Sequence, residues 1–228
     1  MTTQHTPSLE TPTLAPPVVT TDPRQLLSRC FDTTALAIAR VRTKDLPQPT
    51  ACDAMDVAGV LAHLVGIARR LAVMPSDGDI WSIGDPTGVA DDGWGETWRA
   101  AANAALDAWS TDDAITKTYS LPWLTAPGWY MLLNYLGEFT VHTWDVVSAT
   151  GAIVHFDPEV LTICDQYKGD ILPPTGRHEI FEGMRSQMPE SMRNFTDPFQ
   201  DAVTVAPDSP LIDKVVAYTG RDPRFNGA

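Results

Sequence analysis

Apolar side chains recur every three or four residues along four long stretches of this chain, which places them on one face of a helix. The four stretches cover residues 23–42, 56–74, 94–109 and 129–150. Asp22 and Pro23 form a helix-start signal before the first stretch. Pro75 ends the second stretch, and Gly151 supplies a C-terminal stop for the fourth. We therefore expect four long amphipathic helices.

The other segments show weaker patterns. Residues 115–121 alternate weakly between polar and apolar side chains, as in a short strand or an extended arm. The chain after residue 151 is rich in proline, so regular structure there should be short. Within it we expect helices over residues 158–167, 179–184 and 209–218 and a strand-like segment over residues 202–205.

These elements predict a mainly α fold, an antiparallel four-helix bundle with a small α+β C-terminal appendage. A chain of 228 residues fits a single core. We assign residues 22–151 to the bundle and residues 152–228 to the appendage packed on it. Residues 1–21 carry one charged side chain, Glu10, among prolines and threonines, which predicts a disordered tail.

Residues 76–96 form an acidic, glycine-containing connection with no basic side chain. This composition predicts a solvated loop. Trp81 and Ile83 are unusual in a mere linker. They suggest a lid over a site, and we expect Trp81 to contact a bound cofactor.

Charge and composition exclude several classes of partner. The chain has 16 Lys and Arg against 29 Asp and Glu, a net charge of −13, which repels nucleic-acid phosphates. No uninterrupted apolar run approaches the ~18 residues of a membrane span, and the first residues lack the basic region of a secretory signal. We expect a cytoplasmic protein, a monomer or homodimer, that acts on a small molecule.

Three cysteines lie far apart without a CxxC motif, namely Cys30, Cys52 and Cys164. This spacing predicts free thiols instead of a disulfide framework or a zinc knuckle. The chain also lacks a GxSxG elbow, a phosphate-binding glycine loop and an HExxH motif.

Glu138 and His142 are four residues apart on the fourth helix, so their side chains share one face. Such a pair is usually a surface contact. His63 favours a metal site over a surface contact, because it lies on the apolar stripe of the second helix and should face the bundle interior. One metal ion would satisfy all three side chains, and two histidines with one carboxylate leave positions open for chemistry.

Two further residues are candidates for catalytic roles. Asp145 lies three residues after His142 and would accept the free N–H of that ligand, or else lie on the helix surface. Arg70 lies seven residues after His63 and would reach an anionic substrate, or else form a solvated basic helix end.

The segments around these residues resemble the DinB/YfiT-like superfamily, specifically its mycothiol-dependent maleylpyruvate isomerase branch common in actinobacteria. The matching segments are Ala-His-Leu-Val-Gly at residues 62–66, Gly-Glu-Phe-Thr-Val-His-Thr-Trp-Asp at residues 137–145 and Ala-Thr-Gly at residues 149–151. Residues 207–210 and 220–223 are similar to the C-terminal signature of a metal-binding subgroup. The resemblance covers residues 22–225.

The resemblance implies that His63, Glu138 and His142 bind a divalent ion, most often zinc, which activates a small thiol such as mycothiol. The expected function is transfer of that thiol to a small electrophile, or isomerisation of one. Alternatives are a metal-dependent hydrolase, a non-catalytic metal or small-ligand binding module, and a metal-independent enzyme that uses the bundle cavity.

Overall fold

The structure is a computed structural model that describes residues 21–227 apart from residues 53, 122, 123, 171, 188, 189, 191, 192 and 194–196. The tail predicted for residues 1–21 lies outside this part, apart from Thr21. The described residues are mainly helical, with one antiparallel pair of strands. The helices are α1 (Pro23–Ile38), α2 (Val57–Val73), α3 (Trp94–Ala108), α4 (Asp112–Thr116), α5 (Gly128–Thr150), α6 (Pro158–Tyr167), α7 (Arg177–Gln187) and α8 (Leu211–Tyr218), and the strands are β1 (Thr118–Leu121) and β2 (Leu124–Pro127).

Side-chain caps explain where several helices begin. The carboxylates of Asp22, Asp56 and Asp157 accept hydrogen bonds from backbone N–H groups in the first turns of α1, α2 and α6. At the other end of α5, Gly151 adopts φ 67°, a left-handed conformation that favours glycine. The four long helices are confirmed, although α1 ends at Ile38, four residues before the predicted end.

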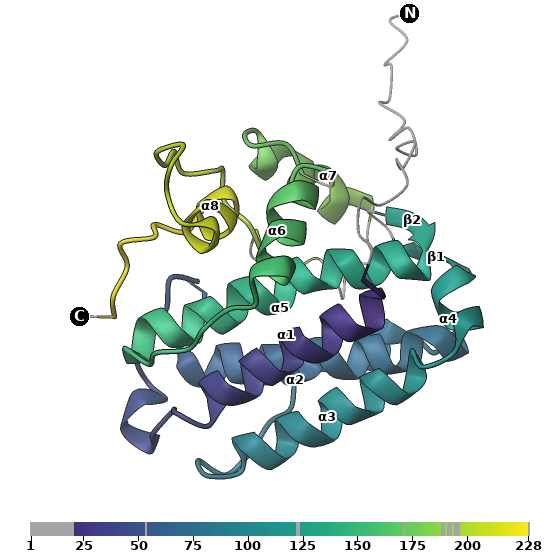
Figure 1. The fold of residues 1–228 in the computed structure, drawn as a ribbon, viewed down its shortest axis with the longest axis horizontal. Helices are drawn as coiled ribbons and strands as arrows, with labels where there is room; N and C mark the ends of the chain where they lie inside the picture. The colour runs from purple at the N-terminus through teal and green to yellow at the C-terminus, as the bar shows by residue number, and fades with distance from the viewer. Residues whose placement is uncertain are drawn as a thin grey trace, which may run out of the picture.

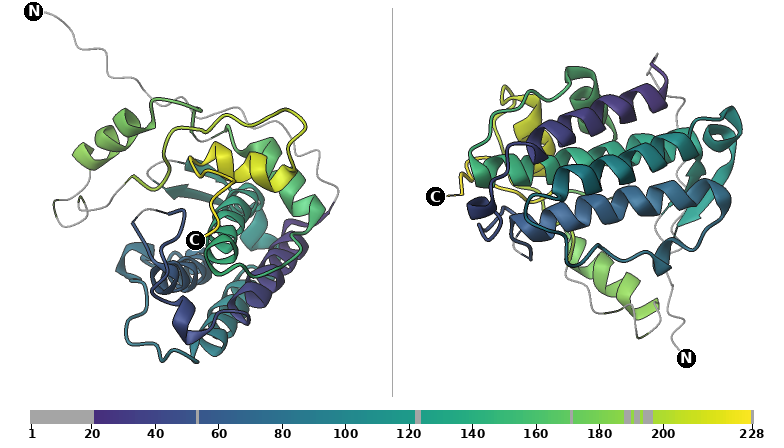
Figure 2. Two further views of the ribbon diagram at one scale, coloured as in Figure 1. Left: turned by 90° about the vertical axis from the view of Figure 1, so that its left-hand side faces the viewer. Right: turned by 90° about the horizontal axis from the view of Figure 1, so that it is seen from below.

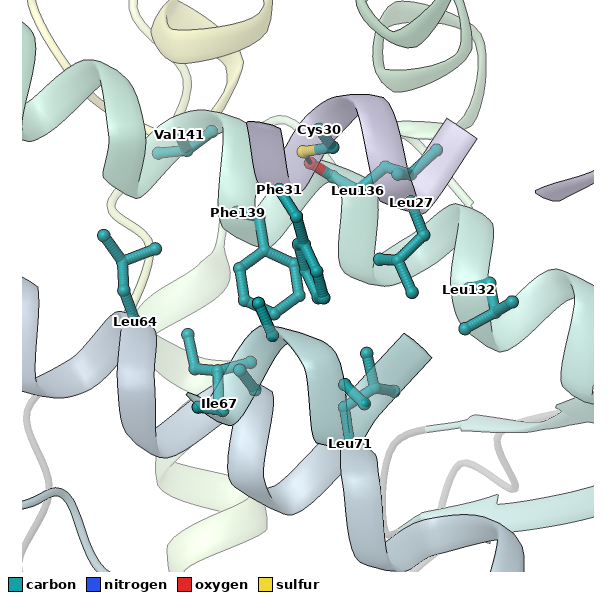
Figure 3. Close-up of a cluster of buried hydrophobic side chains, with 14 of the residues drawn as sticks. Leu27, Cys30, Phe31, Leu64, Ile67, Leu71, Leu132, Leu136, Phe139 and Val141 are labelled. Atoms are coloured by element: carbon teal, nitrogen blue, oxygen red, sulfur yellow. Dashed lines mark hydrogen bonds between the residues drawn. The ribbon is translucent and has the colours of Figure 1, made fainter. Parts of the chain in front are cut away.

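The four long helices lie side by side (Figures 1 and 2). Helix α2 packs against α3 and α5, and α1 packs against the same two helices from the other side. Phe31 of α1 and Phe139 of α5 meet edge to face at a centroid distance of 4.8 Å. Figure 3 shows these rings between leucine and isoleucine side chains of α1, α2 and α5. This core fixes the relative positions of α2 and α5, which carry the candidate metal ligands.

The strand expected at residues 115–121 begins later and has a partner. Thr111 caps the short helix α4, whose first-turn residues Asp112 and Asp113 favour a helix start. Strand β1 then pairs with β2, which the alternation did not predict, in the register Thr118 opposite Pro127. In the sequence, the two strands lie between α4 and α5, within the region assigned to the bundle.

Helices α6 and α8 pack on α5: α6 contacts α5 and α1, and α8 contacts α6 and α5 (Figure 1). The helices predicted after residue 151 are confirmed. The strand-like prediction for residues 202–205 is wrong. Ala202 donates its N–H to the carbonyl of Pro174, and Val203 donates to Ala217, so no described neighbouring strand provides a ladder. Helices are therefore the only regular elements among the described residues of the appendage, and its predicted β component is corrected.

Helix α2 with its 3-10 extension, Val57–Ser76, is long and apolar enough to cross a membrane by length and composition alone. In its most apolar stretch of 18 residues, 56% of the stretch is buried inside the protein. A core helix satisfies the same criterion, because its buried face must be apolar. The sequence contains no uninterrupted apolar run of this length, since His63, Arg69 and Arg70 lie within it.

Candidate metal centre

Helices α2 and α5 bring His63, Glu138 and His142 together. One ligand atom from each side chain lies within 4.8 Å of the other two. The Asp56 cap sets the start of α2, and buried Val60 and Leu64 turn His63 toward α5. The side chains of His63 and Glu138 are 24% and 25% exposed, whereas that of His142 is 4% exposed. His63 therefore lies at the edge of the core and not in its interior, and the cluster is open on one side.

The spacing of the donor atoms fits a metal ion better than direct hydrogen bonds. Glu138 Oε1 lies 3.5 Å from His63 Nε2 and 3.6 Å from His142 Nε2. These distances are at or beyond the limit for a hydrogen bond. Two ligands bound at about 2.1 Å to a tetrahedral ion lie about 3.4 Å apart. The two distances from the Glu138 oxygen therefore match two edges of a tetrahedral site, and the two imidazole ligand atoms lie within 4.8 Å of each other.

The outward nitrogen of His63 contacts a carboxylate from the acidic loop. His63 Nδ1 lies 3.2 Å from Asp85 Oδ2. Arg70 of α2 holds Asp85 through an ion pair of 2.6 Å and also donates from Nε to the carbonyl of Ile83. These contacts attach the loop at residues 83–85 to α2, beside the first of the three candidate ligands.

His142 has an equivalent and more deeply buried arrangement. Its Nδ1 lies 2.9 Å from Asp145 Oδ2. Arg221, beyond α8, donates to both carboxylate oxygens of Asp145 at 3.1 and 3.3 Å. Asp145 is fully buried and Arg221 is 4% exposed. Each imidazole is thus oriented by an aspartate that an arginine holds in turn, which leaves Nε2 free to face Glu138.

These contacts also set the charges of the cluster. Burial opposes ionisation of Glu138, but the two imidazoles outweigh it and hold the pKa of this carboxyl far below its usual range. Burial lowers the pKa of His63, yet Asp85 and Glu138 raise it more, to about 9. For Asp145, burial is outweighed by His142 and Arg221, so its pKa is lowered. The pKa of Asp85 is lowered as well, because His63 and Arg70 outweigh its burial. The carboxylates of Asp85, Glu138 and Asp145 are therefore anionic at neutral pH.

A partly exposed thiol lies beside His142 and Asp145. Cys52, His142 and Asp145 each offer a ligand atom within 4.8 Å of the others. Burial raises the pKa of the Cys52 thiol, and the positive charge of Arg221 opposes this effect in part. The thiol is therefore protonated at neutral pH, and Arg221 disfavours a second cation beside it.

The other predicted site residues lie as follows. Asp145 is buried beside His142, which agrees with the proposed contact and not with a surface position. Arg70 is neither at a solvated helix end nor without partners, because it binds Asp85 and Ile83. Trp81 lies in a 3-10 helix, Ile80–Ser82, within the acidic loop and is 46% exposed. The structure does not join Trp81 to the three ligands by any described contact.

Sequence reasoning missed Asp85, Arg221 and Cys52. Arg221 lies in the Gly-Arg-Asp-Pro segment at residues 220–223, so its position was marked although its role was not. Asp85 is one of several acidic residues in its loop, and nothing in their spacing distinguishes it.

Comparison with known proteins gives two relatives. They are the uncharacterized protein MT0763 of Mycobacterium tuberculosis strain CDC 1551 / Oshkosh and the uncharacterized protein Rv0738 of strain ATCC 25618 / H37Rv. Each is 25% identical to this chain over 206 residues, which make up 89% of this chain and 100% of the relative. No family model matches the chain, and no solved structure matches it significantly. The match extends over the long helices and the appendage together, and the relatives' names state no activity.

Proposed function

We propose that this protein is a metal-dependent enzyme that activates a small thiol, with mycothiol as the candidate. The thiol would be transferred to a small electrophilic substrate, or would isomerise one through a transient adduct. The observation that carries this proposal is the approach of two imidazole Nε2 atoms to one oxygen of Glu138 at 3.5 and 3.6 Å.

The donor set supports a divalent ion, and zinc is the best candidate. Two imidazole nitrogens and one carboxylate oxygen are ligands that zinc accepts, and three protein ligands leave room for an exogenous molecule. A bound ion would displace the proton that His63 carries at neutral pH in the metal-free protein. A dication bound there would lower the pKa of a coordinated thiol and supply a thiolate at neutral pH.

The protein's own residues would orient and protect the site. Asp145 fixes the ring of His142 and makes its Nε2 the ligand atom, since a histidine that donates from Nδ1 presents Nε2 as an acceptor. Asp85 does the same for His63. Access would be from the side where His63 and Glu138 are partly exposed, because the buried side is filled by Asp145 and Arg221.

The same proposal assigns α1, α2, α3 and α5 to an antiparallel four-helix bundle of the DinB/YfiT-like type. Relatives from Mycobacterium tuberculosis agree with a branch common in actinobacteria. A buried α2 and an acidic chain agree with a cytoplasmic enzyme that acts on small molecules.

Metal analysis combined with a thiol-dependence assay tests the proposal. We expect about one zinc ion per chain after purification, lost in His142→Ala and kept in His155→Ala, which alters an exposed histidine outside the cluster. Cobalt-substituted protein should develop a thiolate charge-transfer band when mycothiol is added. Equal metal content in the two variants would refute the metal site. Turnover of an electrophile without thiol would refute thiol activation in favour of hydrolysis.

A further inference from the structure

A cavity lies in the appendage, lined by none of the candidate metal ligands. It has a volume of about 250 Å³ and is open to solvent. It is formed by the end of α6, one face of α8 and the segment between α7 and α8 that runs beside α8 (Figure 1). The residues that line it are Lys168, Ala202, Val203, Val205, Ala206, Pro207, Lys214 and Tyr218.

The wall of this cleft is held in place by backbone hydrogen bonds. Ala202 donates to the carbonyl of Pro174 at 2.7 Å, and Val203 donates to Ala217 of α8 at 2.8 Å. Tyr218 donates its hydroxyl to the carbonyl of Leu172 at 2.7 Å. The cleft is therefore preformed, so a ligand would bind with little loss of conformational entropy in the cleft wall.

The charge of the cleft is opposite to that of the protein. Two lysines and no acidic residue line it, although the chain as a whole carries a net charge of −13. Lys168 pairs with Asp165, but an ammonium has three N–H donors. Lys214 forms no ion pair with any carboxylate of the described part of the chain. An anion in the cleft would find at least one uncompensated cation.

Positive charge also accumulates behind the cleft, around Tyr218. Lys168 Nζ lies 5.4 Å from the centre of the Tyr218 ring, and the Arg177 guanidinium lies 4.7 Å from it. Arg177 is 1% exposed, and its Nη2 has no hydrogen-bond partner among the described residues. Asp201 accepts a hydrogen bond from the backbone N–H of Arg177, so the buried guanidinium has one carboxylate near it and one N–H group still without an acceptor.

We propose that this cleft binds a small organic anion, namely a carboxylate or a phosphate monoester that carries a compact apolar group. Lys214 and Lys168 would hold the anionic group, and the side chains of Val203, Val205 and Pro207 would contact the apolar group. A volume near 250 Å³ is below the ~300–1,000 Å³ of drug-sized sites, so the ligand is compact.

Titration of chelator-treated protein, observed by amide NMR, tests the proposal without interference from a metal ion. Benzoate and phenyl phosphate serve as probes, and neutral benzamide serves as the uncharged analogue. We expect both anions to shift the amide signals of residues 202–206 and 214–218 and benzamide to leave them unchanged. The stronger of the two anions identifies the anionic group that the cleft prefers.

Two variants and one matched control complete the experiment. Lys214→Met should weaken binding of the anions by about tenfold or more, the loss expected for one charge-assisted hydrogen bond. Lys44→Met makes the same change at an exposed lysine in the 3-10 helix Thr43–Asp45 and should bind as wild type. Ala206→Trp fills the cleft at an exposed position and should abolish the shifts. Absence of binding by wild type, or equal binding by the two lysine variants, would overturn the proposal.

Discussion

Asp85 occupies the space that a side chain on Gly66 would fill. A Cβ atom at Gly66 would lie 2.0 Å from Asp85 Oδ1 and 3.2 Å from its Cα. Gly66 lies one turn after His63 on α2, so its missing side chain lets the acidic loop reach the candidate ligand. This glycine therefore acts on the candidate site through the loop.

Gly66→Ala should weaken metal binding without unfolding the protein. The new methyl group would displace Asp85 from His63, and loss of such a supporting carboxylate typically lowers metal affinity by about 10- to 100-fold. Alanine is the better helix former by about 1 kcal/mol, so α2 should not be lost. Competition with a chromophoric chelator measures the affinity.

Gly137→Ala is the matched control for this change. It places the same methyl group next to Glu138 on α5, where nothing lies within 4 Å. Metal affinity should stay at the wild-type value. A similar loss of affinity in both alanine variants would contradict the role given to Asp85.

Asp145→Asn should destabilise the protein strongly. The change leaves the buried guanidinium of Arg221 without a counter-charge, which typically costs about 3–5 kcal/mol. Urea unfolding measures the difference. Asp222→Asn removes an exposed partner of Arg224 and should have little effect. Equal stabilities of the two variants would show that the buried pair contributes nothing.

The metal-free protein should lose stability as the pH rises above neutrality. The pKa of His63 is about 9 in the folded protein against 6.5 ordinarily, so folding favours the protonated imidazole. This stabilisation is present in full below pH 6.5 and disappears as the pH rises through about 9. Urea unfolding in chelator at pH 6.5 and pH 9 measures it, and His63→Gln should remove the difference between the two pH values. His155→Gln is the control and should keep the wild-type difference in stability between the two pH values. If His63→Gln also keeps that difference, the pH dependence comes from groups other than His63.

Cys52 should react with a thiol reagent before the other two cysteines. It is partly exposed, whereas Cys30 and Cys164 are buried and their thiol pKa values are raised to well above neutral. Mass spectrometry after brief treatment of native protein with iodoacetamide should find the label on Cys52. Three labels should appear in denaturant. Early labelling of Cys164 would indicate that α6 opens away from α5.

Local signals explain which parts of the fold and site the sequence predicts. The aspartate caps of α1 and α2, the Gly151 stop of α5 and the periodic apolar positions each lie within or next to one helix, so these helices were predictable from neighbouring residues. The same holds for Glu138 and His142, which share a helix face. Placing His63 beside them required only that two apolar stripes meet.

Contacts that depend on the path of a loop were not predictable in this way. Asp85 meets His63 across 22 positions of sequence, and Arg221 meets Asp145 across 76. Neither distance is set by a helical period. The wrong strand at residues 202–205 has a similar cause, because a short run rich in β-branched residues fits a segment that binds a helix end as well as one that joins a sheet.

The pairing of Asp145 with Arg221 also bears on folding during synthesis of the chain. A ribosome makes His63, Glu138 and His142 well before Arg221, so a growing chain holds all three candidate ligands while Asp145 still lacks its cation. Until Arg221 emerges, burial of the Asp145 carboxylate would cost free energy that its ion pair offsets in the complete chain. A product that stops before α8 would therefore contain every candidate metal ligand and still lack the cation that holds Asp145 beside His142.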